Sequence, residues 1–246
     1  MSRRESRLSD ADLVAREYAS EERFLARRAA LVDYVEGPNA EELALDAIAE
    51  AAPQRVLEVG AGTGAFAERV RREVGADVTA VDLSPRMVEL ARERGVPASE
   101  ADVQQLPFDD GAFDCAAALW VLHHVPDLDR GLRELARVIR PGGCLVAVAF
   151  GQENLADLYE LLEQPSLGDG GFSRENGEAA LARHFARVER RDADGTVVFP
   201  DRVAVERYLR SLVLIRGTEP LERLPRFDGP FRSRSRHAVF VAEKAG

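Results

Sequence analysis

The sequence predicts an α/β protein built on a doubly wound, mostly parallel β-sheet with helices on both faces. From residue 54 to residue 150, short apolar runs rich in β-branched residues alternate with helix-forming segments, which is the pattern of βαβ units. The apolar runs VLEV, VTAV and CLVAVAF lack polar alternation, as expected for strands that are covered on both faces. A chain of 246 residues is long enough for one such domain.

Two helices are expected ahead of the first strand. Ser9 is an N-cap signal, and the helical spacing of apolar residues that follows it continues until Gly37 and Pro38 stop it. Asn39 begins a second helix, which ends near Pro53. We expect residues 1–53 to form a helical lid or appendage in front of the sheet.

The remaining elements follow in order from apolar runs, caps and breakers. Ser84 before Pro85 is an N-cap followed by proline at the first helical position. Strands are expected at 55–59, 77–81, 97–101, 112–119, 144–150, 188–191, 196–199 and 238–242. Helices are expected at 65–74, 85–94, 128–139, 153–162, 178–184 and 203–214. We expect residues 54–150 to be a ligand-binding core and residues 151–246 to complete the same domain with insertions at the site.

Composition excludes several function classes. The 33 basic and 43 acidic residues give a net charge of -10, so the chain lacks the electrostatic footprint of a general nucleic-acid binder. Lys244 is the single lysine, which excludes a Walker phosphate loop and an internal Schiff-base lysine. Cys115 and Cys144 lie in apolar runs and are interpreted as buried hydrophobic residues rather than metal ligands or a disulfide, so no metal is expected.

Location and assembly are expected from what the sequence contains. No apolar run approaches the ~18 residues that a membrane span needs, and the first residues, MSRRESRLSDADLV, have no apolar signal core. These observations predict a cytoplasmic protein without membrane or nucleic-acid partners, and a monomer or homodimer.

A glycine cluster is the main functional signal. Gly60, Gly62 and Gly64 directly follow the first core strand, where a helix N-terminus and bare backbone form a ligand crevice. Asp82 follows Gly62 by twenty positions, the distance at which a carboxylate meets ribose hydroxyls. Gly60, Gly62 and Ala65 also satisfy the dinucleotide pattern GxGxxA, so a nicotinamide-dependent oxidoreductase is an alternative, as is a non-catalytic cofactor-binding module.

Four ordered motifs narrow this choice. They are VLEVGAGTG, AVDLSPRMVELAR, ADVQQLPFDDGAFD and LHHVPDLDRGLRELARVIRPGG. Over about residues 54–150 the sequence resembles the class I S-adenosylmethionine-dependent methyltransferases, and most closely those that act on small molecules. The resemblance implies a Rossmann-like sheet of seven strands with an N-terminal helical lid, and in-line methyl transfer from S-adenosylmethionine to a small-molecule acceptor, with S-adenosylhomocysteine as product.

The resemblance also implies donor-binding roles for individual residues. Asp82 would accept hydrogen bonds from the ribose hydroxyls, and Asp102 would bind the adenine amino group. Carboxylates suit such positions because charge-assisted hydrogen bonds offset part of their desolvation. The full implied set is Glu58, Gly60, Ala61, Gly62, Thr63 and Gly64 around the methionine part, Leu83, Met87 and Val103 at the adenine, and Leu119 near the methyl group.

The acceptor side is less determined by the sequence. His123 and His124 follow the strand 112–119 and are candidates for a general base, with helix capping or packing as the alternative. Tyr18 is expected either to close over the cofactor or to pack within the first helix. Trp120 is expected either to line the acceptor pocket or to belong to the core. The arginine-rich segment 226–236 is interpreted as a solvated loop, with binding of an anionic acceptor or nucleic acid as the alternative.

Overall fold

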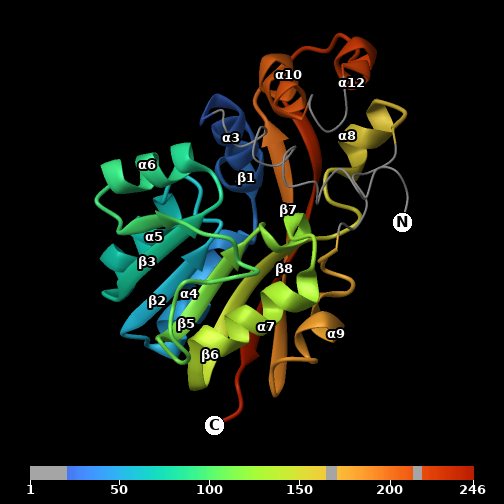
Figure 1. Ribbon diagram of the computed structural model, residues 1–246. Helices are drawn as coiled ribbons and strands as arrows, with labels where there is room; N and C mark the ends of the chain where they lie inside the picture. The colour runs from blue at the N-terminus through green and yellow to red at the C-terminus, as the bar shows by residue number, and fades with distance from the viewer. Residues whose placement is uncertain (1–20, 165–170, 213–217) are drawn as a thin grey trace.

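One eight-stranded sheet organises the chain, with the strand order β1-β7-β8-β6-β5-β2-β3-β4. The computed structural model describes residues 21–164, 171–212 and 218–246. Strands β2 to β6 run parallel, and β8 pairs antiparallel with both β6 and β7. The strands are β1 (Val35–Glu36), β2 (Arg55–Val59), β3 (Asp77–Asp82), β4 (Ala98–Glu100), β5 (Phe113–Leu119), β6 (Ile139–Phe150), β7 (Arg187–Phe199) and β8 (Phe231–Glu243). Figure 1 shows this twisted sheet running through the molecule.

The predicted mostly parallel α/β sheet is confirmed, with differences at its antiparallel edge. The eighth strand, β1, lies where the sequence predicted the end of a helix, and it pairs with β7 through Val35 and Val197. The two strands predicted at 188–191 and 196–199 are one strand, because β8 pairs with β7 along its whole length. Gly195 lies within β7, and a Cβ there would come within 2.8 Å of the Glu36 carbonyl oxygen, so glycine permits the approach of β1.

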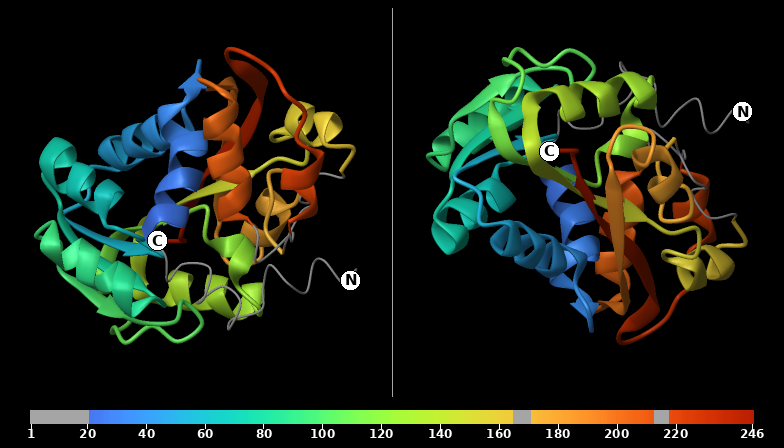
Figure 2. Two further views of the ribbon diagram at one scale, coloured as in Figure 1. Left: turned by 90° about the horizontal axis from the view of Figure 1, so that it is seen from above. Right: turned by 90° about the horizontal axis from the view of Figure 1, so that it is seen from below.

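Helices cover both faces of the sheet. On one face lie α4 (Ala40–Ala51), α5 (Ala65–Arg69) with its continuation η2 (Val70–Val74), and α6 (Pro85–Glu93), and on the other lie α7 (Leu128–Val138) and α9 (Gly177–Leu181). Each face has its own buried apolar cluster, which removes both surfaces of the parallel strands from water. Figure 2 shows the two helical layers on either side of the sheet.

A third group of helices sits over one end of the sheet. It comprises α3 (Glu21–Arg28), α8 (Ala156–Leu161), α10 (Arg202–Ser211) and α12 (Glu219–Arg223). Apolar residues of α8, α10 and the segment after α3 form a separate cluster around Phe199 at the end of β7. Helix α3 packs beside α10 at the top of Figure 1. These elements come from both ends of the chain and meet above the parallel strands.

Two predicted capping signals are confirmed, whereas the third, Ser9, lies outside the described residues. The Asn39 side chain accepts a hydrogen bond from the Glu41 N–H at 2.8 Å and starts α4. The Ser84 hydroxyl accepts from the Met87 N–H at 3.4 Å and starts α6, with Pro85 at the first helical position. Such caps satisfy N–H groups that the helix itself leaves unpaired.

The predicted solvated loop at 226–236 is wrong for its second half, which forms the start of β8. Arg234 forms ion pairs with Asp157 at 3.0 Å and with Glu160 at 2.7 Å, and Arg232 pairs with Glu36 at 2.7 Å. The arginines therefore fasten β8 to α8 and β1. At the other end of β8, the Lys244 ammonium donates to the Ile139 carbonyl at 2.6 Å.

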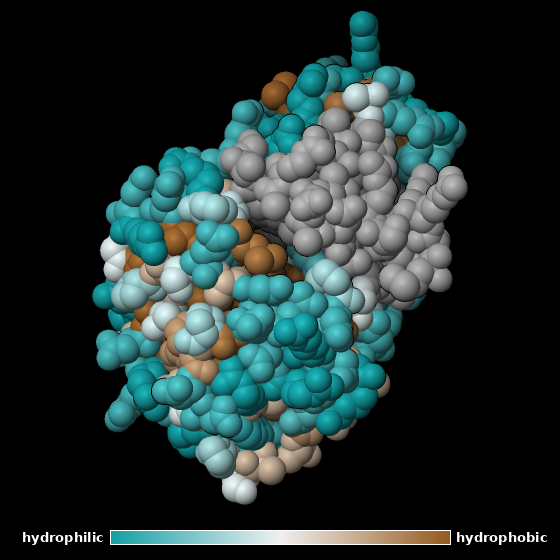
Figure 3. Space-filling view, in the orientation of Figure 1, coloured by the Kyte–Doolittle hydropathy of each residue, from teal (hydrophilic) through white to brown (hydrophobic). Residues whose placement is uncertain are grey.

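The molecular surface is mostly hydrophilic on the face that Figure 3 shows. Within the described area of this face, hydrophobic side chains gather around a central hollow. Within the described ranges, no helix has the length and apolar character needed to cross a bilayer. Cys115 and Cys144 are buried free thiols on adjacent strands, as the sequence predicted.

Candidate active site

A cavity of about 290 Å³ opens at the carboxyl ends of β2, β3 and β5. From β2 the chain continues to β3 and β4 on one side, and β5 and β6 lie on the other side of β2. Doubly wound sheets bind ligands at such a switch point. Ten of the twelve residues predicted to bind the methyl donor line the cavity: Glu58, Gly60, Ala61, Gly62, Thr63, Asp82, Leu83, Asp102, Val103 and Leu119. The topology therefore gathers residues that are up to 61 positions apart in sequence, from Glu58 to Leu119.

The glycine loop after β2 is built so that only glycine fits. Gly60 and Gly62 have φ values of 64° and 54°, in the left-handed region that side chains disfavour. A Cβ on Gly60 would lie 2.7 Å from the Val121 Cβ, and one on Gly62 would lie 2.6 Å from the Phe24 ring. The loop backbone thus forms one wall of the cavity, with α3 directly above it.

Asp82 holds this loop in place. One carboxylate oxygen accepts the Gly62 N–H at 2.8 Å, and the other accepts the Ser84 N–H at 2.9 Å. Burial raises the pKa of Asp82, while the N–H groups of Ser84, Gly62 and Leu83 oppose that shift. The carboxylate therefore joins the ends of β2 and β3 at the cavity and retains acceptor capacity for a ligand hydroxyl.

Glu58 is the most perturbed carboxyl group in the cavity. Its side chain is 4% exposed, and its Oε2 atom has no hydrogen-bond partner among the described residues. Burial, and then the nearby Glu41 carboxylate, raise the pKa of Glu58 to about 8. A buried carboxyl with an unpaired oxygen fits a ligand that brings its own positive donor, such as an ammonium group.

Asp102 is turned toward the turn that follows β4. Its carboxylate accepts the Gln104 backbone N–H at 2.8 Å and the Gln104 side-chain amide at 2.9 Å. The amide oxygen of Gln104 accepts a hydrogen bond from the Asp127 N–H at 3.0 Å. This bond links the turn to the start of α7. Gln104 also lines the cavity. A ligand that binds the Asp102 carboxylate would therefore share this acceptor with the Gln104 side chain.

Two predicted donor residues lie outside the cavity, and one predicted substrate residue lies outside the described residues. Met87 is fully buried in the first turn of α6, and Gly64 faces Ala91 of the same helix. Neither residue lines the cavity. Leu83, by contrast, lines it and is 45% exposed. Tyr18 belongs to the residues that the structure does not describe.

An aromatic cluster forms the side of the cavity beyond Leu119. Trp120 has a φ of 52°, an uncommon conformation for a bulky residue, and its ring centroid lies 6.4 Å from that of Phe150. The His123 ring contacts Phe150 and His124 at centroid distances of 5.2 and 3.9 Å. Desolvation, with smaller contributions from His124 and Arg27, lowers the pKa of His123 well below its usual range. His123 is therefore a neutral imidazole at neutral pH, and its surroundings disfavour the protonated form.

Further lining residues were not identified from the sequence. They come from the helices above the sheet, and include Phe24, Arg27 and Arg28 of α3, Glu41 of α4, Tyr159 of α8 and Tyr208 of α10. The Tyr159 and Tyr208 hydroxyl oxygens are 3.5 Å apart, although the residues are 49 positions apart in sequence. No local pattern marks these residues, because only tertiary packing brings them to the cavity.

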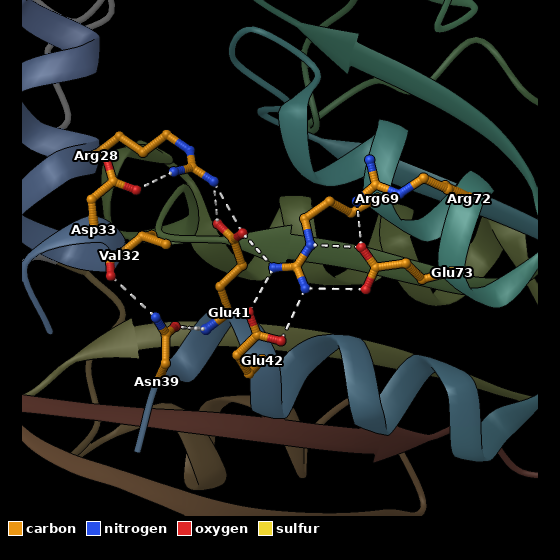
Figure 4. A network of polar contacts seen from close by, with 9 residues as sticks. All are labelled: Arg28, Val32, Asp33, Asn39, Glu41, Glu42, Arg69, Arg72 and Glu73. Carbon is orange, nitrogen blue, oxygen red and sulfur yellow. Dashed lines mark hydrogen bonds and ion pairs between the residues drawn. The ribbon is translucent and has the colours of Figure 1, made fainter. Parts of the chain in front are cut away.

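A buried ion-pair network fastens α3 to the glycine-loop side of the site. Glu41 is 3% exposed, and it accepts two hydrogen bonds from Arg28 at 3.0 Å and one from Arg69 at 2.9 Å. Arg69 continues the network to Glu42 at 2.9 Å and Glu73 at 3.2 Å. Figure 4 shows Glu41 between the two arginines. Its buried charge is thereby compensated on both sides.

Comparisons with known proteins identify the core. Residues 57–147 match the methyltransferase domain family. The demethylmenaquinone methyltransferase of Thermus thermophilus is 39% identical over 114 residues, covering 44% of this chain and 52% of that protein. The malonyl-(acyl-carrier protein) O-methyltransferase of Geobacter sulfurreducens is 35% identical over 176 residues, covering 65% of each chain. The match spans about half the length of the first of these relatives.

A solved structure shows that the likeness in fold extends beyond this core. The phospholethanolamine N-methyltransferase 2 of Haemonchus contortus, in complex with S-adenosylhomocysteine, has a TM-score of 0.61 and 19% identity. The alignment covers 96% of this chain and 60% of that chain. The shared fold therefore includes the elements that follow residue 147, where the match to the domain family ends.

Proposed function

The chain belongs to the class I S-adenosylmethionine-dependent methyltransferase family, and we propose that it transfers the methyl group of this donor to a small-molecule acceptor in the cavity. The observation that carries the proposal is the arrangement of three carboxyl groups, those of Glu58, Asp82 and Asp102, around a glycine loop at the sheet switch point. The family match favours this function over a nicotinamide-dependent oxidoreductase.

The residues at the donor end suit S-adenosylmethionine. Glu58 offers an unpaired buried oxygen for the ammonium group, and the bare backbone at Gly60 and Gly62 leaves room beside the loop. Asp82 would bind the ribose hydroxyls. Asp102 would accept a hydrogen bond from the adenine amino group, and the Val103 N–H would donate to an adenine ring nitrogen, with Leu83 against the ring. Carboxylates bonded to neutral hydroxyl and amino donors keep part of the stabilisation that water would supply.

The donor, when bound, supplies a methyl group that is already electrophilic on a sulfonium. The chain then has to position the acceptor, exclude water and accept a proton from the acceptor where one is released. Leu119 and Trp120 lie where the donor end meets the aromatic cluster. We assign the proton-accepting role to His123 because of its position: it lines the cavity beside Phe150 and is unprotonated at neutral pH.

The acceptor end is formed mainly by parts of the chain outside the domain-family match. Phe150, Tyr159, Phe172 and Tyr208 line it and lie beyond residue 147. Relatives are named for methylating demethylmenaquinone or a malonyl-acyl-carrier protein, so acceptor choice varies around a common core. A cytoplasmic place of action, as a monomer or homodimer, is part of the same proposal.

Donor binding is the direct test. Isothermal titration with S-adenosylhomocysteine should give a dissociation constant in the ~micromolar range, and Asp82→Ala should abolish most of the binding. Asp77→Ala is the matched control, since Asp77 lies at the opposite end of β3. No binding by the wild-type protein, together with a melting-temperature increase in NAD or NADP, would overturn the proposal. Binding without turnover on any acceptor would instead indicate a non-catalytic module.

A further inference from the structure

The acceptor end of the cavity has a distinct chemical character. We propose that it binds an uncharged hydroxyaromatic compound with a second oxygen substituent: the ring lies against Trp120, Phe150 and His123, and the second oxygen meets the hydroxyl pair of Tyr159 and Tyr208. The proposal rests on the proposed function, because it concerns the acceptor of that same methyl transfer.

The distribution of charge argues against a cationic acceptor. Among the described residues, the carboxyl groups that line the cavity are those of Glu41, Glu58, Asp82 and Asp102. Glu41 is paired with two arginines, and the other three surround the donor end. No described lining residue after Leu119 carries a carboxylate, whereas the positive charge of Arg27 acts on His123. The described part of the acceptor end thus supplies no carboxylate to an ammonium acceptor.

The base argues against a carboxylic acid acceptor. A carboxylate is already deprotonated and nucleophilic at neutral pH, so it has no proton to give. His123 lines the cavity, and as the proposed base it would take a proton only from an acceptor that releases one. A phenol, whose pKa is near ~10, is such an acceptor.

The shape of the walls favours a flat ring. The rings of Trp120 and Phe150 are nearly parallel, with an interplanar angle of 29°, and His123 meets Phe150 edge to face at 71°. Rings prefer such offset and edge contacts at centroid distances of ~4.5–7 Å. Phe172 continues this lining on the side of α9. An aromatic acceptor would extend an existing cluster of rings.

The two tyrosines provide a polar feature in an apolar setting. Tyr159 and Tyr208 are 3% and 5% exposed, and belong to the apolar cluster around Phe199. Their hydroxyl oxygens are 3.5 Å apart and both residues line the cavity. A phenol hydroxyl donates and accepts hydrogen bonds, so the pair suits a neutral oxygen substituent of the acceptor.

The reaction balances without a further reagent. The acceptor oxygen forms a bond to the methyl carbon, the carbon–sulfur bond breaks, and its electron pair passes to sulfur. The phenolic proton moves to the His123 imidazole and then to solvent. The products are an aryl methyl ether, S-adenosylhomocysteine and one proton.

Four probes that share a naphthalene ring test the proposal. Protein saturated with S-adenosylhomocysteine is titrated with dihydroxynaphthalene, naphthol, naphthylmethylamine and naphthoate, and turnover with S-adenosylmethionine is followed by mass spectrometry. We expect dihydroxynaphthalene to bind most tightly, and aryl methyl ether to form from the two hydroxyl probes alone. Methylation or tighter binding of the amine or the carboxylate would overturn the proposal. So would failure of the hydroxyl probes to bind.

Variants locate the binding of the second oxygen. Tyr208→Phe should weaken dihydroxynaphthalene binding about tenfold, the effect of one hydrogen bond, while naphthol and S-adenosylhomocysteine bind as before. Tyr34→Phe is the control, because Tyr34 packs on Phe199 outside the cavity lining. An equal effect of Tyr208→Phe on both hydroxyl probes would contradict the role of the pair. Failure of the wild-type protein to bind S-adenosylhomocysteine would instead refute the proposed function.

Discussion

The Asp82 carboxylate accepts the Gly62 backbone N–H at 2.8 Å, so the group proposed to bind the ribose also fixes the glycine loop beside it. The carboxylate is pinned from a second side by the Ser84 N–H. Its orientation is therefore set before any ligand arrives, and little side-chain entropy remains to be lost on binding.

Gly62→Ala should destabilise the protein through a clash with Phe24. The new Cβ would lie 2.6 Å from the Phe24 ring, in a backbone conformation with φ 54°. We expect a loss of more than ~1 kcal/mol in unfolding free energy, since strain of this kind costs ~1–3 kcal/mol. Gly229→Ala is the control, because Gly229 has a φ of 82° with no atom within 4 Å of the added Cβ. Chemical denaturation should show a larger loss of unfolding free energy for Gly62→Ala than for Gly229→Ala. Adding Phe24→Ala to the Gly62→Ala variant should remove the clash and restore part of that loss.

Glu58 should make stability depend on pH. Its pKa is raised to about 8 in the folded protein, against ~4.3 in an unfolded chain. The folded state thus holds a proton that the unfolded state loses, and stability should fall as pH rises from ~4.3 to about 8, by at most ~1.4 kcal/mol per pH unit. Glu58→Gln should remove this part of the slope in denaturation curves measured across pH. An unchanged slope would contradict the assignment.

Proton release should accompany donor binding at neutral pH. A ligand ammonium at the Glu58 carboxyl favours the ionised form, so the proton held below pH 8 is expelled. Titration of S-adenosylhomocysteine in buffers of different ionisation enthalpy should detect this proton in the wild type. The Glu58→Gln variant should release less. Equal release by both proteins would show that another group titrates.

Glu41→Ala should be strongly destabilising. Removing the buried carboxylate leaves Arg28 and Arg69 without their shared partner, and hydrogen bonds to a charged group contribute ~1.5–3 kcal/mol. Glu42→Ala is the matched control, since Glu42 is 55% exposed on the same helix and pairs with the same Arg69. The Glu42→Ala substitution should lower the unfolding free energy by at most ~1 kcal/mol. Thermal unfolding of both variants distinguishes the two sites.

His123 should set the acid limb of the pH profile. His124 contributes to lowering the pKa of His123, so His124→Phe should raise that pKa and move the loss of kcat/KM to higher pH. His123→Ala should lower kcat ~100-fold or more while S-adenosylhomocysteine still binds. His184→Ala is the control, because His184 pairs with Asp129 and does not line the cavity. A His123→Ala variant with unaltered kcat would exclude this histidine as the base.

The sequence was informative where function depends on local backbone. Gly60 and Gly62 adopt the positive φ angles that only glycine tolerates well, and Ser84 and Asn39 cap the helices that follow them. Each of these signals lies within a few residues of the structure it specifies. Asp82 was predicted from its spacing to Gly62, and Asp102 from the resemblance to the methyltransferases.

Other features depended on packing that a single sequence does not display. The inward-facing, buried residues at the start of β8 are polar: Ser233, Ser235 and His237. Because they alternate with arginines, the sequence shows no apolar face there, and this part of the strand was interpreted as a loop. Tyr159 and Tyr208 belong to short helices that are joined only through the third apolar cluster. Met87 faces the core rather than the cavity, because the buried side of α6 includes its first turn.

The bond between Lys244 and the Ile139 carbonyl places the chain's single lysine at the start of β6, the opposite end of the parallel strands from the cavity. An amine-reactive surface or dye can therefore attach only here or at the α-amino group. Immobilisation through Lys244 would leave the cavity mouth facing outward. Of the chain's two kinds of amine, the Lys244 ammonium thus offers a tether at the end of the parallel strands away from the cavity.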